Sequence, residues 1–130
     1  MVRAMFSFIL GDLAVHESPQ QAAASMEAID VEAGDYEAIY DQDGVLYQPV
    51  VEGAQVELRA TEIRDYHDLV SRLKAFRELA GLALPEDAPD FPLAMARIVA
   101  ERSWKRRWPK RPAWLSRRIH GPGPPRFDSL

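Results

Sequence analysis

The sequence predicts an α+β fold, a small two-layer sandwich in which an antiparallel sheet of three to four strands is covered by helices on one face. Three observations predict it. First, a central stretch combines alternating apolar residues with two turn signals. Second, helical periodicity is found on both sides of that stretch. Third, 130 residues are enough to form one hydrophobic core. The predicted order of elements is β-α-β-β-β-α-α, followed by a basic C-terminal extension.

The central stretch is predicted to be a three-stranded meander. Asp43-Gly44 and Gly53-Ala54 form its turns, because these residue types tolerate the positive φ of tight hairpins. The strands are expected at Tyr36–Tyr40, Val45–Val51 and Gln55–Ala60.

The expected registers set Tyr40 opposite Tyr47, Tyr36 opposite Val51, and Val51 opposite Val56. Pro49 has no N–H to donate, so we expect a bulge there, an early end to the second pairing of the meander, or an edge position for that strand. One face of the meander is then apolar and requires a covering helix layer. Its members are Tyr36, Ala38, Tyr40, Val45, Tyr47, Val51, Val56, Leu58 and Ala60.

The N-terminal part is predicted to hold one strand and one helix. Residues 5–10 (MFSFIL) form a strand, and Gly11 is favoured as a bulge in a longer bent strand, with a Gly11-Asp12 hairpin turn as the alternative. Ser18, Pro19 and Gln21 mark a helix start. The helix would run to about Val31, end before Gly34, and turn Ala22, Met26 and Ile29 toward the sheet.

A strong helical pattern follows the meander. Thr61 is the expected N-cap, Gly81 the stop, and Asp68 and Arg72 are spaced for an i,i+4 ion pair. The apolar positions recur at steps of three and four: Ile63, Tyr66, Leu69, Val70, Leu73, Phe76, Leu79 and Ala80.

A last long helix is predicted after the proline-containing loop 82–90. Asp90 caps it and it runs to about Arg106, with buried positions at Leu93, Met95, Ile98, Val99 and Trp104. A turn of helix over 113–118 and a disordered Pro/Gly tail over 120–130 complete the expectation.

Charge divides the chain into two predicted parts. Residues 1–100, an acidic α+β domain, hold 7 Lys+Arg and 18 Asp+Glu, for a net charge of −11. Residues 101–130, a basic tryptophan-containing extension, hold 9 and 2, for a net charge of +7. This asymmetry is more informative than the overall net charge of −4.

The acidic side chains of the meander suggest a surface for a basic partner, against the alternative of an ordinary solvated strand face. Such a protein-binding module would resemble in role a bacterial immunity protein or antitoxin, whose carboxylates cover a basic toxin domain. The predicted partner-binding residues are Glu37, Asp41, Asp43, Glu52 and Glu57.

The basic segment suggests competing uses. Cations interleaved with tryptophan suit RNA or single-stranded DNA, a homo-oligomer contact or docking on the chain's own body, or an acidic protein. Binding of nucleic acid is the less favoured alternative, because the acidic body repels phosphate. The segment comprises Arg102, Trp104, Lys105, Arg106, Arg107, Trp108, Lys110, Arg111 and Trp114, followed by Arg117 and Arg118.

No catalytic motif appears, so the sequence predicts a protein that is not an enzyme and needs no cofactor or metal. His16, His67 and His120 lack metal-site spacing, and the calcium-loop pattern fails around Gly44. The tyrosines at 36, 40 and 47 are expected in the core rather than in a ligand cleft. Without cysteine, thiolate chemistry is excluded. The absence of a signal or membrane-length apolar run favours a cytoplasmic protein with no membrane partner.

Overall fold

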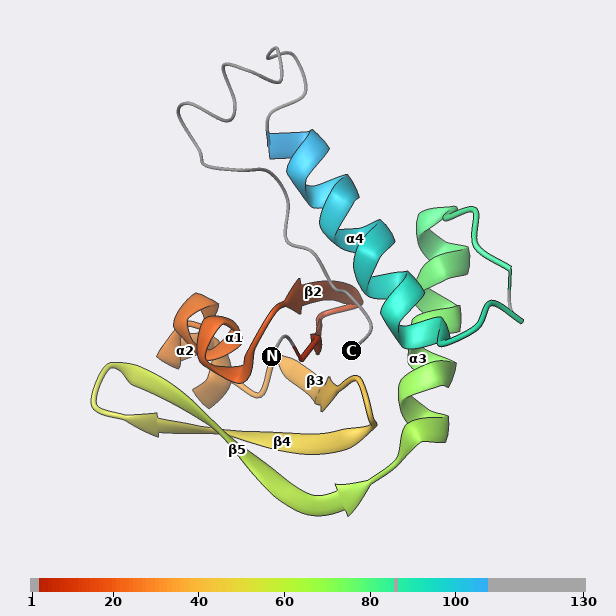
Figure 1. The fold of residues 1–130 in the computed structure, drawn as a ribbon. Coiled ribbons are helices and arrows are strands. Elements are labelled where there is room, and N and C mark those ends of the chain that lie inside the picture. The colour runs from red at the N-terminus through yellow and green to blue at the C-terminus, as the bar shows by residue number, and fades with distance from the viewer. Residues whose placement is uncertain (1–2, 86, 108–130) are drawn as a thin grey trace.

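A computed structural model describes residues 3–85 and 87–107, with side chains described as far as residue 103. Its sheet is antiparallel and five-stranded, in the spatial order β2-β1-β3-β4-β5 (Figure 1). The α+β class is therefore confirmed. The elements are β1 (Met5–Ile9), β2 (Asp12–His16), α1 (Pro19–Ser25), α2 (Ala28–Glu32), β3 (Tyr36–Asp41), β4 (Val45–Glu52), β5 (Gln55–Arg64), α3 (Tyr66–Ala80) and α4 (Phe91–Arg107).

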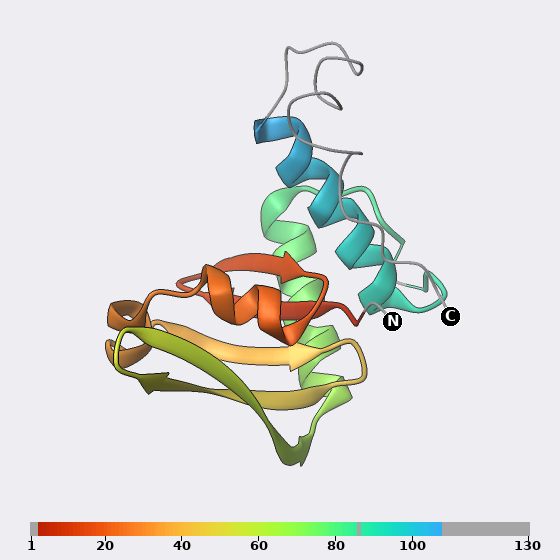
Figure 2. The ribbon, with the colours of Figure 1, turned by 60° about the vertical axis from the view of Figure 1, so that its left-hand side comes forward.

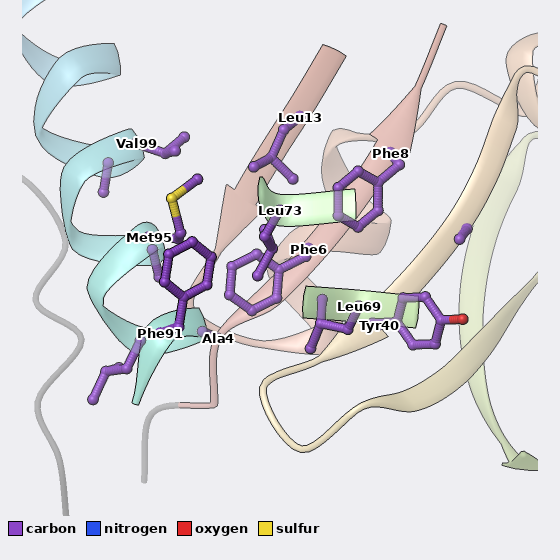
Figure 3. Close-up of a cluster of buried hydrophobic side chains, with 14 residues drawn as sticks. Ala4, Phe6, Phe8, Leu13, Tyr40, Leu69, Leu73, Phe91, Met95 and Val99 are labelled. Carbon is purple, nitrogen blue, oxygen red and sulfur yellow. The ribbon is translucent and has the colours of Figure 1, made fainter. Parts of the chain in front are cut away.

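Helices cover both faces of the sheet, which corrects the prediction of a single covered face. Figures 1 and 2 show α1 and α2 on one side and α3 and α4 on the other. The reason lies in β1 and β3, where successive residues are buried on opposite faces. Met5 and Ile39 pack with Ala22 and Met26 of the α1 segment. Phe6, Phe8, Ala38 and Tyr40 pack with the side chains of α3 and α4, among them Leu69, Leu73, Phe91 and Met95 (Figure 3).

β1 and β2 form a hairpin rather than one bent strand, so the favoured reading of Gly11 was wrong. Ile9 pairs with Asp12, which leaves a two-residue loop. Both loop residues have positive φ, 48° at Leu10 and 79° at Gly11. That combination is a type I′ turn, whose twist matches the strands it joins. The alternative prediction, a hairpin turn at Gly11-Asp12, is closer to the structure, in which the turn lies one residue earlier.

The meander is confirmed, with a shifted first register. The loop Gln42–Gly44 has three residues, so Tyr40 pairs with Leu46 instead of Tyr47, while Val51 pairs with Val56 as predicted. Tyr36 pairs with Ile9 of β1.

Pro49 pairs with Leu58 of β5, and the β3–β4 ladder is limited to Tyr40 and Leu46. The ladder between β4 and β5 continues past Pro49 to Glu52, so the expected early end of that pairing is not found. The irregularity in the ladder between β4 and β5 lies between Val45 and Tyr47, ahead of Pro49.

The first helix is shorter than predicted. Ser18 accepts a hydrogen bond from the Gln21 N–H, and Pro19 opens α1 as expected. The helix ends at Ser25, however, and α2 follows as a separate turn of five residues. Ile29 of α2 is 70% exposed, so its predicted contact with the sheet is wrong.

α3 begins later than predicted, because β5 extends to Arg64. Asp65, not Thr61, is the N-cap, and it accepts from the Asp68 N–H. Thr61 instead donates its hydroxyl to the Leu46 carbonyl at 2.8 Å. The predicted burial is therefore wrong for Ile63, Tyr66 and Leu79, which are exposed.

Two helix ends agree with the prediction. Gly81 ends α3 in the left-handed conformation, φ 67°. Asp90 precedes α4 and accepts from the Leu93 N–H. α4 continues across residue 100, and the division into 1–100 and 101–130 stays a prediction. The predictions for Trp104 as a buried residue, for 113–118 and for 120–130 lie outside the described residues or side chains.

Candidate functional site

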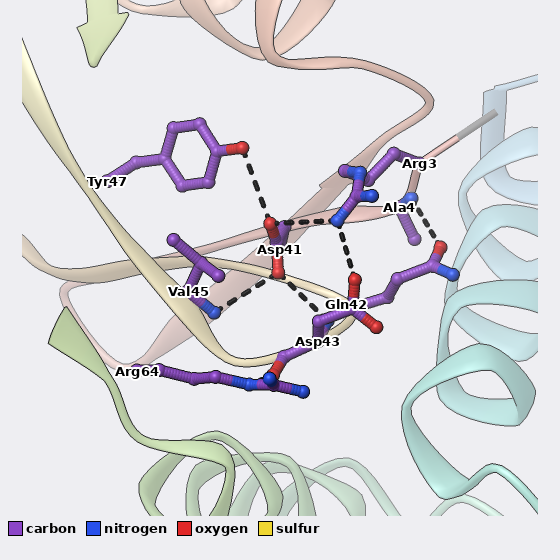
Figure 4. A network of polar contacts seen from close by, with 8 residues as sticks. All are labelled: Arg3, Ala4, Asp41, Gln42, Asp43, Val45, Tyr47 and Arg64. Carbon is purple, nitrogen blue, oxygen red and sulfur yellow. Dashed lines mark hydrogen bonds and ion pairs between the residues drawn. The ribbon is translucent and has the colours of Figure 1, made fainter. Parts of the chain in front are cut away.

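Two of the five predicted partner-binding carboxylates serve the fold itself. Asp41 ends β3 and is 1% exposed. One of its oxygens accepts from the backbone N–H groups of Asp43 at 2.8 Å and Val45 at 3.1 Å. The other accepts from the Tyr47 hydroxyl at 3.3 Å and from Arg3 at 3.2 Å (Figure 4). Asp41 therefore closes the β3–β4 turn and is buried away from any partner.

Asp43 belongs to the same polar network. Arg3 reaches its carboxylate at 2.6 Å, and Arg64 donates to its backbone carbonyl at 3.1 Å. Next to it, the Gln42 side chain accepts from the Ala4 N–H at 2.9 Å. The network ties the N-terminal strand to the turn, and cations of the chain itself balance its negative charge (Figure 4).

Glu37 is also engaged, at the β1–β2 hairpin. It accepts from the Gly11 N–H at 3.1 Å and from Arg72 at 3.4 Å. Arg72 in turn binds Asp68 at 2.9 Å, which confirms the predicted i,i+4 pair, and Asp68 accepts from the Tyr40 hydroxyl at 2.6 Å. The Tyr40 and Arg72 hydrogen bonds lower the pKa of Asp68. Burial, followed by the Asp68 hydrogen bond, raises the pKa of Tyr40 well above its ordinary range.

The last two predicted carboxylates lie on the exposed β4–β5 hairpin. Glu52 and Glu57 both bind Arg59, at 3.0 and 3.3 Å, and all three side chains are more than half exposed. The five predicted residues therefore form no single surface. They divide among an interior turn, a contact between the sheet and α3, and the hairpin.

A second acidic surface lies on and around α2, and the sequence prediction did not include it. It consists of four carboxylates, Glu27, Asp30, Glu32 and Asp35, hereafter the α2 acidic face. No Lys or Arg among the described residues pairs with any of them. Within the described part of the chain, the α2 acidic face is thus negative without a compensating cation.

Tyr36 and Ile29 give this face its chemical character. Burial raises the pKa of Tyr36, and the charges of Asp30, Glu27 and Asp35 raise it further. Ile29, within α2, is exposed to 70%. An exposed apolar side chain in a segment whose carboxylates have no cationic partner among the described residues suits a contact surface for a basic protein. In the sequence, the α2 acidic face appears as acidic residues that recur between positions 27 and 35. The same pattern is equally typical of an ordinary solvent-exposed helix surface.

An open cleft of about 530 Å³ separates α1 from the start of β5. Its α1 wall includes Pro19, Ala23 and Met26, and its β5 wall consists of residues 54–58. Figure 1 places α2 close to the end of the sheet where the β4–β5 hairpin closes, and Figure 2 agrees. The cleft and the α2 acidic face therefore share one end of the molecule.

The remaining candidates give no reactive geometry. His16 is half-buried, its Nδ1 has no hydrogen-bond partner, and burial lowers its pKa. The described residues contain no group of three or more His, Asp or Glu placed to hold a metal ion. None of the helices in the described part is both long and apolar enough to cross a membrane.

Of the basic segment, only the Arg102 side chain is described, and it donates to the Ala80 carbonyl at 3.4 Å. The side chains from Trp104 onward lie outside the described part.

No family model matches this sequence, and comparison with curated proteins and with solved structures found no significant match.

Proposed function

We propose that this protein is a non-enzymatic, cytoplasmic protein-binding module that neutralises a basic protein partner, in the manner of a bacterial immunity protein or antitoxin. The α2 acidic face is the observation that carries the proposal. Its four carboxylates have no cationic partner among the described residues, and the exposed Ile29 lies in the same segment. A basic partner gains their full attraction, because nothing within the described molecule competes for it.

The contact is centred on α2 rather than on the strands of the meander. Asp41 and Asp43 already bind Arg3, and Glu37 already binds Arg72. A partner's cation would have to displace these internal ones. Glu52 and Glu57 share the exposed Arg59, and they extend the acidic surface from α2 along the hairpin. The proposed contact residues are therefore Glu27, Asp30, Glu32, Asp35, Glu52 and Glu57.

The partner class follows from this chemistry. Carboxylates spaced along a surface imitate the phosphates of a nucleic acid, so a nuclease's positively charged cleft is a natural target. An exposed isoleucine supplies the apolar anchor that purely electrostatic contacts lack.

The first test is affinity capture from the organism of origin with mass spectrometry, with and without nuclease treatment. A basic protein retained after nuclease treatment is expected. A bound fraction that disappears with nuclease treatment would point instead to nucleic-acid binding through Arg102–Arg118.

The second test measures affinity for the captured partner. Asp30→Lys combined with Asp35→Lys is expected to weaken binding by about 100-fold, since each reversed contact costs about 1–2 kcal/mol. The matched control is Glu78→Lys combined with Asp87→Lys, two exposed acids away from α2, which should leave affinity within about threefold. Equal affinities for both double variants would reject the α2 acidic face as the binding surface.

A further inference from the structure

β5 has a free edge beside the cleft. It is ten residues long and lies at the margin of the described sheet, with β4 on its other side. The cleft is lined by the consecutive residues 54–58. Because alternate residues of a strand point to opposite faces, a cavity bordered by consecutive ones follows the edge of the strand, not one face. The backbone N–H and C=O groups of that edge therefore border open space.

Several of the usual protections of a free edge are missing here. Natural sheets blunt long edges with proline, charged side chains, bulges, short strands or a covering helix. α1 lies beside β5 across the cleft, and Glu57 and Arg59 are charged. β5 contains neither proline nor lysine, and its ladder with β4 is regular from Gln55 to Ala60. This half of the strand is a template on which a further strand can pair.

The sequence of β5 is complementary to itself in one antiparallel register. In an antiparallel pair, the numbers of any two paired residues have the same sum. When Leu58 pairs with Leu58 of a second copy, Glu57 of each copy therefore lies opposite Arg59 of the other copy. Both side chains are exposed and point to the same face. Two reciprocal opposite-charge pairs result, the cross-strand arrangement that stabilises a sheet.

The other face of the same register is apolar. Val56 lies opposite Ala60 of the second copy, on either side of the Leu58 pair. Val56 and Leu58 already pack against the α1 cluster, and both remain only half-buried. The exposed Ala60 is small enough to enter beside the α1 wall of the cleft. From residue 56 to residue 60, polar pairs thus gather on one face and apolar pairs on the other. Beyond them, Glu62 lies opposite Ala54.

We infer that the chain forms a symmetric dimer by antiparallel pairing of β5 with β5 of a second copy, centred on Leu58. The two five-stranded sheets then become one continuous sheet. Each cleft receives residues 58–62 of the other copy. This interface shares Glu57 with the proposed partner contact but uses neither the α2 acidic face nor the C-terminal segment. Its test uses the chain without any partner, so its outcome is decided separately from that of the proposed function.

The test is sedimentation equilibrium of the full chain from about 1 µM to 1 mM, with charge-reversed variants. The wild-type chain is expected to reach twice its monomer mass. Glu57→Arg alone and Arg59→Glu alone each place like charges opposite one another twice, and each should weaken dimerisation at least tenfold. Urea unfolding confirms that each variant is folded.

Two complementation measurements distinguish this register from any other interface. An equimolar mixture of the Glu57→Arg and Arg59→Glu chains restores both opposite-charge pairs, and the chain that carries both substitutions does so as well. Both samples are expected to recover the dimer mass. Glu78→Arg on α3 is the charge control and should dimerise like wild type.

Three results would overturn the inference. One is a monomer mass for wild type at every concentration. Another is dimerisation unaffected by the single reversals, which would point to a different surface. The last is a mixture that stays monomeric although each variant is folded.

Discussion

Asp41→Asn tests whether the buried carboxylate at the β3–β4 turn holds the turn together. The side chain is 1% exposed and accepts four hydrogen bonds. Asparagine keeps the shape and one acceptor oxygen, so the bonds from the Asp43 and Val45 N–H groups survive in neutral form. Its amide nitrogen, however, turns two donor hydrogens toward Arg3, which is a donor only, and toward the Tyr47 hydroxyl, which must rotate to accept.

The expected loss is about 2–3 kcal/mol of unfolding free energy. A hydrogen bond to a charged group contributes about 1.5–3 kcal/mol, against about 1 kcal/mol for a neutral one. The ion pair with Arg3 adds at most about 1 kcal/mol, because the Arg3 side chain is 42% exposed. With a urea slope of about 2 kcal/mol/M, the unfolding midpoint of Asp41→Asn should fall by about 1–1.5 M.

Asp43→Asn is the matched control, because it alters the same network at its exposed end. Asp43 lies closer to Arg3 than Asp41 does, 2.6 Å against 3.2 Å, but its side chain is 48% exposed. We expect it to cost less than about 1 kcal/mol, since water screens the exposed pair. Equal losses for the two variants, or a loss below about 0.5 kcal/mol for Asp41→Asn, would refute the reasoning that burial decides the energy here.

Three further predictions concern turns and titration. Gly44→Ala should lower the unfolding free energy measured in urea by more than about 2 kcal/mol, because φ at Gly44 is 86° and the added Cβ would lie 2.7 Å from the backbone of the first α3 residue. Gly53→Ala, which has open space around the added Cβ, should lower it by about 1 kcal/mol. Leu10→Asn should raise the unfolding free energy by about 0.5–1 kcal/mol, because Leu10 has φ 48° in a type I′ turn and its side chain is 72% exposed; an unchanged midpoint would argue against that turn. Tyr40→Phe should raise the pKa of Asp68 toward its ordinary value. Because the pKa of Asp68 is lowered in the folded state, the stability that the Tyr40–Asp68 pair supplies is present at neutral pH and is lost as the pH falls through that pKa. The unfolding free energies of wild type and variant should therefore converge below about pH 4 in pH-dependent unfolding.

The meander could be predicted from the sequence because its determinants are local. Gly44 and Gly53 both adopt positive φ, as the turn reading required. The β1–β2 hairpin was only the less favoured alternative. Leu10 carries one of its two positive φ values, and leucine is not a residue typical of such a turn. Tertiary pairing with β3 holds this strained residue in place.

The covering of both sheet faces had a signal that was not used. Met5, Phe6 and Phe8 follow one another with little polar interruption, and Ile39 interrupts the alternation of Ala38 and Tyr40. Strands buried on both faces read as continuous apolar runs. The start of α3 had no such signal, since the spacing of Ile63 and Tyr66 fits a helix while both side chains are exposed.

The sequence shows how many acids the chain has but not which of them are paired within the fold. A carboxylate at a strand end, such as Asp41, looks the same in sequence whether it faces solvent or receives backbone N–H groups from the turn that follows. Only the fold brings Arg3 to that position, from 38 residues away. The number of acids in the chain therefore says little about which of them are free to bind a partner.

The carboxylates left free are those whose loss the fold tolerates best, and this makes the proposed function testable. α2 has five residues, none of them fully buried, and Val31 is the one that packs against the smaller core cluster of the described residues. Asp30 lies amid like charges, and replacing it with lysine relieves repulsion with Glu27 and Asp35 instead of breaking an ion pair. Asp30→Lys should therefore unfold at the same urea concentration as wild type or at a slightly higher one. A loss of partner binding in that variant would then report on the surface alone, whereas the same loss in Asp41→Asn would be inseparable from the weakened turn.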